Sequence, residues 1–460
     1  MVDSATISTP IPQAPGGIPV LGHVLPLLRN PLDFLASLPD HGDVVQMRVG
    51  TLRLVVVCDP GLTRHVLKDL QTFDKGGPII ARIEEVLGES SVGTCPHSAH
   101  RRLRTLVQPA FHRERLPAYA RVMTANFLDL GWHDGQVVDV PAEMGIRTVH
   151  TLVETMFSDK LSPETTARVL DETATALREI YRRAVRPPVL DRLPLPGNRA
   201  FDRAGVGIRG VLGDVLAARR ASGADPDDLL SALLTARLPG AEGAPARAGD
   251  ALSESEIGDQ LITFLTGGTE SSASTLAWAF HQLGQHPDIR TRLYEELDTV
   301  LAGGPATFEH LPQLRLTANI ITEALRLYPP AWVLSRTVVA DTELGGHPVR
   351  AGSMIIFSPY IIHRRPDLYP DPDTFAPDRW ADGTVSGRSY FLPFGGGVRK
   401  CIGDQFALTE MVLGLANIAA RWHLEPVPGA TPGVQIGVSL HPRNLMMRVT
   451  ARHHPPTTSE

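Results

Sequence analysis

The chain has few cysteines. Only Cys58, Cys95 and Cys401 occur among 460 residues, which is too few for the disulfide framework that stabilises small secreted proteins. A reducing compartment is therefore expected. Basic residues are not in excess either, because the formal net charge is −6 at pH 7. Nothing in this balance favours binding to nucleic acid.

Long apolar segments are also lacking. Residues 1–17 are polar and proline-rich, without the basic and apolar regions of a signal peptide. The apolar run at 18–28 is interrupted by prolines, and it is well short of the roughly 20 residues that cross a bilayer. We therefore expect a cytoplasmic protein with no membrane span. Residues 1–16 are expected to form a flexible tail, residues 17–453 a single domain without a fused flavin reductase, and residues 454–460 a disordered end.

Helical periodicity dominates the rest of the sequence. Two strands joined by a turn near Gly50 are expected over residues 43–58, and short strands around 336–340, around 353–358 and in the last forty residues. The segment 359–393, rich in proline and charge, is expected to be irregular. The pattern predicts a mainly α fold with a small β-rich subdomain. Helices are expected at 98–109, 117–131, 142–157, 163–182, 200–221, 254–285, 288–302, 313–327 and 404–419.

Cys401 lies in the most informative stretch of the chain. Glycines around it allow the backbone to approach a large flat partner. The helical pattern that starts at Asp404 and the neighbouring cations Arg399 and Lys400 favour a thiolate over a thiol, and such a thiolate is a good ligand for iron. The alternative is a buried, inert cysteine in a glycine turn. The spacing Phe-x-x-Gly-x-Arg-x-Cys-x-Gly is formed by Phe394, Gly397, Arg399, Cys401 and Gly403.

The longest helical pattern, 254–285, carries Gly267 and Gly268 in its middle, followed by Glu270 and Ser271. Two glycines inside a helix cost about 1 kcal/mol each relative to alanine, which a closely packed flat cofactor would offset. They also permit a local break in the hydrogen-bond ladder. The alternative interpretation is a glycine-weakened helix with exposed hydroxyl groups.

Two further pairs share a helix face because of their spacing. Glu323 and Arg326 lie three residues apart, and Arg379 follows about fifty residues later, shortly before the cysteine loop. The planar fork of arginine suits a buried carboxylate. His100 and Arg104 lie four residues apart, where the alternative is a basic, solvated helix.

Together these motifs resemble the cytochrome P-450 family. The cysteine run is similar to the family's heme-thiolate loop, and the Gly267–Ser271 segment is similar to its oxygen-handling helix, with serine where threonine is usual. Glu323, Arg326 and Arg379 follow the order of the family's structural triad. The resemblance implies a cytochrome P-450 fold in which heme b lies between the long central helix and the helix that follows the cysteine loop.

The resemblance also implies a role for each matched residue. Cys401 would be the axial ligand of the heme iron, and Glu270 with Ser271 would deliver protons for oxygen chemistry. The triad would hold the irregular segment and the cysteine loop in place. The remaining heme contacts would come from His100, Arg104, Gly267, Arg336, Phe394, Arg399 and Gly403, of which the basic residues would bind the propionates.

The expected substrate is apolar, since few charged residues fall in the segments expected near the heme. The runs at 12–45, 72–77 and 192–201 resemble bacterial sesquiterpene oxidases, which implies stepwise oxidation of a pentalenene methyl group to alcohol and aldehyde in pentalenolactone-type antibiotic biosynthesis. O2 would be consumed, with electrons from a ferredoxin and its reductase. The segments expected to line the substrate space are 73–93, 179–194, 264–268, 331–334 and 436–440. Their apolar side chains are Ile79, Ile80, Val86, Leu87, Trp332, Val333, Leu334 and Val438.

An acidic ferredoxin would meet a basic surface formed by Arg101, Arg102, Arg113, Arg115 and Lys400. A monomer satisfies every expectation above.

Three alternatives remain open. The enzyme could hydroxylate another terpene, a polyketide or a fatty acid; it could be a peroxide-driven oxygenase, against which Glu270 and Ser271 argue; or the chain could be a heme sensor or carrier without catalysis.

Overall fold

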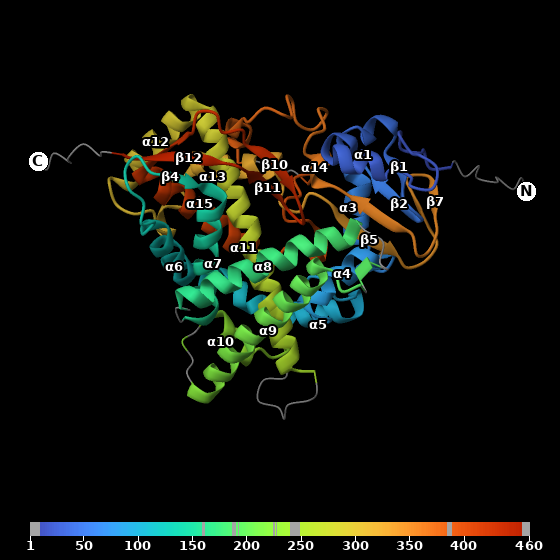
Figure 1. Ribbon diagram of the computed structural model, residues 1–460, viewed down its shortest axis with the longest axis horizontal. Coiled ribbons are helices and arrows are strands. Elements are labelled where there is room, and N and C mark those ends of the chain that lie inside the picture. The colour runs from blue at the N-terminus through green and yellow to red at the C-terminus, as the bar shows by residue number, and fades with distance from the viewer. Residues whose placement is uncertain are drawn as a thin grey trace, which may run out of the picture.

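The longest helix, α11 (Glu254–Gln285), runs through the middle of the molecule (Figure 1). It begins with a capping box: the Ser253 hydroxyl accepts a hydrogen bond from the Glu256 amide, and the Glu256 carboxylate accepts one from the Ser253 amide. These bonds satisfy amide groups that a helix N-terminus otherwise leaves without partners. The helix expected over 254–285 is confirmed with the same bounds.

The computed structural model describes residues 10–158, 162–185, 190–191, 193–223, 226, 228–239, 249–383 and 389–452. Helices fill one part of the molecule, and the larger sheet gathers at the N-terminal side (Figure 1). Besides α11, the helices are α1 (Val24–Arg29), α2 (Pro31–Ala36), α3 (Pro60–Lys68), α4 (Gly77–Leu87), α5 (His97–Val107), α6 (Leu116–Leu128), α7 (Val140–Phe157), α8 (Pro163–Val185), α9 (Pro196–Ser222), α10 (Leu229–Thr235), α12 (Pro287–Leu301), α13 (Arg315–Leu327), α14 (Pro359–Ile362) and α15 (Asp404–Arg421).

Each expected helix is present within a few residues of its expected bounds. Helices α1, α2, α3, α4, α10 and α14 were not expected, because they are short and mostly contain a proline in the first turn or an interrupted apolar pattern. Helix α1 buries none of its side chains, so its sequence carries no periodic signal. None of the helices in the described part of the chain combines the length and hydropathy that a membrane span requires.

A five-stranded sheet in the order β1-β2-β8-β5-β3 forms the β-rich subdomain, and smaller sheets pair β4-β12-β9, β10-β11 and β6-β7. The hairpin of β1 and β2 turns at Gly50 and Thr51 as expected. The strands are β1 (Val44–Val49), β2 (Leu52–Val57), β3 (Phe73–Asp74), β4 (Val137–Asp139), β5 (Leu334–Val338), β6 (Thr342–Leu344), β7 (His347–Val349), β8 (Met354–Phe357), β9 (Trp422–Pro426), β10 (Gly433–Ile436), β11 (Leu440–Arg443) and β12 (Met446–Ala451).

The central strands of this sheet are buried on both faces. In β2 and β8, Leu54, Val56 and Ile356 belong to one apolar cluster, and the alternating Val55 and Ile355 belong to another. Alternation is the period of a strand, so each face of the sheet has its own small core. The largest apolar cluster surrounds α11 and includes side chains of α5, α6, α7, α9, α13 and α15.

The chain joins the sheet before residue 17. The Ala14 amide donates to the Gln46 carbonyl at 2.8 Å, and the Gln46 amide donates to the Pro12 carbonyl at 2.7 Å. The expectation of a flexible tail over 1–16 is therefore wrong for residues 12–14, because their backbone groups pair with β1. Residues 1–9 and the expected disordered end at 454–460 lie outside the described residues.

The expected triad around Glu323 is assembled. Glu323 and Arg326 are completely buried and form a bidentate pair, with nitrogen–oxygen distances of 2.9 and 2.8 Å. Arg379 lies 3.4 Å from the same carboxylate, and the Trp380 indole N–H donates to it at 2.8 Å. Arg326 also donates to carbonyls at residues 363, 372 and 374. The irregular segment after α14 is thereby attached to α13.

His363 carries this attachment on to the cysteine loop. Its Nδ1 lies 3.2 Å from the Arg326 carbonyl, and its Nε2 accepts a hydrogen bond from the Leu392 amide at 2.8 Å. The two partners require a neutral ring with its proton on Nδ1. The triad therefore acts on the cysteine loop through a histidine that the sequence motifs did not reveal.

Replacing His363 by leucine removes both hydrogen bonds and leaves a buried amide and a buried carbonyl without partners. We expect a loss of about 3 kcal/mol in the free energy of unfolding, measured by denaturant titration. His133→Leu, at an exposed position, is the matched control and should change it by about 0.5 kcal/mol or less.

His363 also makes the free energy of unfolding depend on pH. Burial, and after it the charge of Arg326, lowers the pKa of His363 to about 3, whereas an unfolded histidine titrates near 6.5. Between these values only the unfolded chain takes up this proton, so acid lowers the free energy of unfolding by up to about 1.4 kcal/mol per pH unit. Between pH 7 and pH 5 the wild type should lose more stability than His363→Leu; equal losses would contradict this account.

Candidate functional site

A cavity of about 340 Å³ lies between α11 and the loop that precedes α15. Its wall is built from segments far apart in the sequence, including α5, α7, α11, β5 and residues 393–403. The structure therefore brings together nearly all the predicted site residues in one lining. Those on the wall are His100, Arg104, Gly267, Ser271, Arg336, Phe394, Arg399, Cys401 and Gly403.

Cys401 faces this cavity from a loop whose shape depends on glycine. The Cys401 amide donates to the Phe394 carbonyl at 2.9 Å, which closes the loop. Gly397 has a φ of +66°, and a Cβ added there would lie 2.3 Å from the Leu67 carbonyl oxygen. Only glycine fits this contact. The loop is thus pressed against the end of α3 and presents the thiol to the cavity.

The protein alone does not favour the Cys401 thiolate. Burial raises the pKa of the thiol, and the Gly403 amide, Arg104 and Lys400 oppose this effect. The prediction that Arg399 stabilises the thiolate is wrong, because its guanidinium binds Asp74 at 3.1 Å. A metal ion deprotonates a coordinating thiol outright, so the charge of a bound iron is the stronger cause of ionisation here.

Helix α11 passes over the cavity as one continuous helix from Glu254 to Gln285, although its two central glycines would permit a local break. A Cβ added at Gly267 would meet open space, whereas one at Gly268 would lie 3.0 Å from Leu152 on α7. The lack of a side chain at Gly267 therefore leaves space in the cavity, and the lack of one at Gly268 allows α7 and α11 to pack closely. The Ser271 hydroxyl donates to the Gly267 carbonyl at 2.9 Å.

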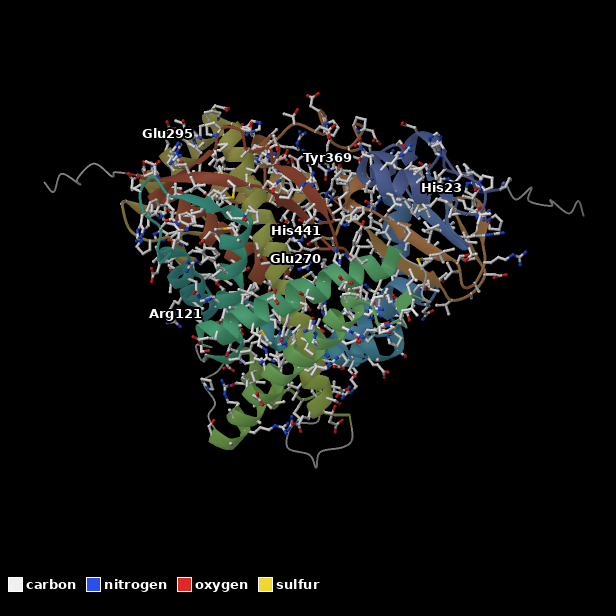
Figure 2. The ribbon with its side chains drawn as sticks, viewed as in Figure 1. His23, Arg121, Glu270, Glu295, Tyr369 and His441 are labelled. Carbon is white, nitrogen blue, oxygen red and sulfur yellow. The ribbon has the colours of Figure 1, made fainter. Side chains whose placement is uncertain are left out.

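Glu270 does not lie on the cavity wall. Its carboxylate pairs with Nε2 of His441 on β11, and Figure 2 shows the two side chains close together near the middle of α11. His441 was not among the predicted site residues. Since 170 positions separate it from Glu270 in the printed sequence, only the packing of β11 on α11 reveals the pair.

Basic side chains concentrate at one end of the cavity. Lys75, His100, Arg104, Arg336 and Arg399 all line it. Asp74, bound to Arg399, offsets only part of this charge. The Nε atoms of Arg336 and Arg399 are buried and have no hydrogen-bond partner among the described residues. Buried cations need anionic partners, so this end of the cavity fits a ligand with carboxylate groups.

The charge imbalance also appears in the pKa values. Burial, with Arg336 and Arg399 nearby, lowers the pKa of Lys75 to about 7. Burial and Arg399 lower that of Arg336 to about 10. Burial and the neighbouring cations lower the pKa of His100 to about 4, so its ring is neutral at pH 7 before heme binds. The two propionates of a heme would supply the missing negative charge.

Lys75 lies in the expected lining segment 73–93, although no motif singled it out as a site residue. It directly follows β3, whose Asp74 pairs with Thr337 of β5, and this register brings Lys75 beside Arg336. A two-residue strand leaves no periodic signal in the sequence, so no pattern could have found the contact.

The expected lining is confirmed in part: segments 73–93, 264–268 and 331–334 contribute to the cavity wall, whereas the described residues of 179–194 and 436–440 do not. Of the eight apolar side chains expected there, Leu334 lines the cavity and the other seven do not. Trp332 turns its indole N–H to the Gly437 carbonyl at 3.0 Å, while Ile80 and Val86 are buried in apolar packing. The apolar wall is formed by residues of the expected segments and by others that were not expected. The former are Val92, Phe264, Ala331 and Leu334, and the latter are Phe111, Leu152, Leu325, Phe406 and Met411.

A cysteine that faces the cavity, a glycine on α11 that leaves space beside it and a cluster of unbalanced cations together fit a heme-thiolate site. The sequence model of the family "Cytochrome P450" matches residues 12–449, and the chain belongs to this family. The protein is a cytochrome P450 monooxygenase, which binds heme b with a cysteine thiolate as the axial ligand of the iron and uses O2 with a redox partner.

Curated relatives cover nearly the whole chain. Cyclooctat-9-en-7-ol 5-monooxygenase of Streptomyces melanosporofaciens is 43% identical over 91% of this chain and 90% of its own length. Pentalenene oxygenase of Streptomyces avermitilis is 41% identical over 95% and 97%. Cyclooctatin synthase of Streptomyces melanosporofaciens is 39% identical over 94% of each chain. These relatives are similar to the present protein along the full fold and not only at the motifs.

Heme binding is expected to draw a proton onto Lys75. Before heme binds, at pH 8, the lowered pKa leaves this amine mostly neutral; the propionates favour the charged form and raise the pKa. Titration of heme into heme-free protein, by calorimetry in buffers of different ionisation enthalpy, should show proton uptake. Uptake should fall in Lys75→Met and persist in Lys68→Met, an exposed control. Unchanged uptake in Lys75→Met would contradict the assignment.

Replacing Cys401 by histidine should retain heme but change the iron ligand. The dithionite-reduced CO complex of the wild type should show the thiolate-type Soret shift, and Cys401→His should lose it. Cys95→Ala is the control, since Cys95 is buried 3.8 Å from Arg399 and does not line the cavity. A thiolate-type spectrum in Cys401→His would refute the ligand.

Proposed function

We propose that the enzyme oxidises a polycyclic terpene, with pentalenene as the first candidate, by stepwise conversion of a methyl group to an alcohol and an aldehyde in pentalenolactone-type antibiotic biosynthesis. The observation that supports this most is the full-length similarity to pentalenene oxygenase. The cavity agrees with an apolar substrate, because none of the described acidic residues lines it and apolar side chains, among them Phe264, Leu152 and Leu334, form much of its wall.

The residues of this chain would divide the work in three parts. The cations Arg104, Arg336 and Arg399 would hold the propionates, and Cys401 would ligate the iron. Heme b, when bound, supplies the oxygen-activating chemistry. Glu270 and Ser271 would then serve the proton supply, Ser271 from the cavity wall and Glu270 from the position beside it.

A different terpene is the main alternative, because a relative of similar identity is named for cyclooctat-9-en-7-ol. Incubation of the purified enzyme with pentalenene, a ferredoxin, its reductase and NADPH should give products heavier by one oxygen, followed by the aldehyde, detected by mass spectrometry. If the enzyme forms product from cyclooctat-9-en-7-ol and none from pentalenene, cyclooctat-9-en-7-ol takes the place of pentalenene as the proposed substrate. Heme binding without product from any terpene, fatty acid or polyketide would favour a sensor or carrier.

The electron donor is proposed to be an acidic ferredoxin that docks beside the cysteine loop. The proposed basic surface is smaller than expected from the sequence. Arg102 is engaged by Glu256 at 2.6 Å and Lys400 pairs with Asp404, whereas Arg101 and Arg113 have exposed side chains. These two arginines are the best candidates for contact with the donor.

Reversing the charge at Arg113 should therefore weaken the reaction with ferredoxin. In Arg113→Glu, we expect the ferredoxin concentration for half-maximal NADPH oxidation to rise several-fold at low salt, with the difference narrowing as salt screens the contact. Arg53→Glu, an exposed change on β2, is the matched control. Equal effects of both variants would show only a response to net charge.

A further inference from the structure

One row of α11 side chains holds the C-terminal hairpin. Glu270, Ser274 and Trp278 are spaced four residues apart and lie along one helix face. The Ser274 hydroxyl and the Trp278 indole N–H both donate to the Leu440 carbonyl, at 2.5 and 3.1 Å. Glu270 completes the row through its pair with His441. Strand β11 is thus attached to α11 at three successive positions of this row.

The neighbouring row of α11 faces the cavity. Gly267, Ser271 and Thr275, also four residues apart, all line it. Consecutive residues of a helix are rotated by about 100°, so Glu270 lies next to Ser271 but directs its carboxylate to the hairpin (Figure 2). The carboxylate stands at the border between the cavity-facing side and the hairpin-facing side of the helix.

His441 is well placed to fix that carboxylate. The Glu270 side chain is 24% exposed and that of His441 is 22% exposed, so both are open to some water. A partly exposed glutamate samples several rotamers unless a partner selects one. The imidazole is itself fixed, because its Nε2 also lies 3.1 Å from the Ser439 hydroxyl and the adjacent Leu440 is completely buried.

We propose that His441 is a positioning residue for proton supply, which holds the Glu270 carboxylate where it takes protons from water and passes them toward Ser271 in the cavity. The inference deepens the proposed function and rests on it. Each proton moves from bulk water to the carboxylate and onward, so the carboxylate is regenerated and no further reactant is needed. When the carboxylate is not held, O2 takes up two electrons from NADPH and two protons and leaves as hydrogen peroxide, so that no substrate is oxidised.

Two substitutions at one position separate positioning from other roles. His441→Leu removes the N–H donor, whereas His441→Gln keeps an amide N–H at a similar reach. With pentalenene and the ferredoxin system, His441→Leu should give several-fold less product per NADPH and correspondingly more peroxide. His441→Gln should restore most of the wild-type ratio. His423→Leu, which breaks a similar pair with Glu425 on β9 away from the cavity, should match the wild type.

Measurements independent of turnover complete the test. The CO complex of His441→Leu should remain of the thiolate type, and the shifts in unfolding midpoint caused by His441→Leu and Glu270→Gln should be non-additive. If leucine prevents folding, His441→Ala takes its place in the same comparison.

The outcomes distinguish the two proposals. A wild type that oxidises no terpene overturns the proposed function and this inference with it. A wild type that forms product, together with a His441→Leu variant of equal product per NADPH, overturns only the role of His441. Equal losses in His441→Gln and His441→Leu also overturn positioning, since a donor at the same reach then fails to restore the ratio.

Discussion

The Glu323 carboxylate is completely buried, and a buried carboxylate needs donors on every side. Arg326 supplies two, and the Trp380 indole supplies another from a segment about fifty residues later. The irregular chain between them has no regular ladder to hold it, so this polar centre determines its path. His363 then extends the attachment to Leu392 at the start of the cysteine loop. The position of the thiol therefore depends on a charge cluster remote from the chemistry.

At the end of the cavity that fits the heme propionates, the positive charges are only partly matched by the described acidic side chains. Around Glu323 the charges are satisfied within the protein, whereas Lys75, Arg336 and Arg399 meet with Asp74 as the acidic partner. The first cluster is a completed structural unit, and the second is complete only with a ligand that brings carboxylates. This difference separates the structural from the binding arginines, although both kinds are buried and both belong to recognisable motifs.

Sequence reasoning succeeded where a motif fixes residues at short spacing. Gly267, Ser271, Arg399 and Cys401 all reached the cavity wall because their local spacing determines which face of a helix or loop they occupy. The long helices were also predictable, since each buries a continuous apolar stripe.

What remained hidden depends on contacts between distant segments. Lys75 reaches the site through a two-residue strand, and His441 through the packing of a hairpin on α11. Trp332 was expected in the substrate space because it is apolar, but its indole N–H has a carbonyl partner on the hairpin. Such orientations follow from tertiary hydrogen bonds, which leave no period in the sequence.

The parts of the heme site are synthesised at different times. Lys75, His100 and Arg104 belong to the first quarter of the chain, and Cys401 to its last part. During synthesis only part of the propionate-binding group emerges early, because Arg336 follows much later and Arg399 emerges together with the ligand of the iron. Stable capture of the prosthetic group therefore belongs to the end of translation, when the loop pressed against α3 is complete. A nascent chain that stops before this loop lacks both Arg399 and the ligand of the metal.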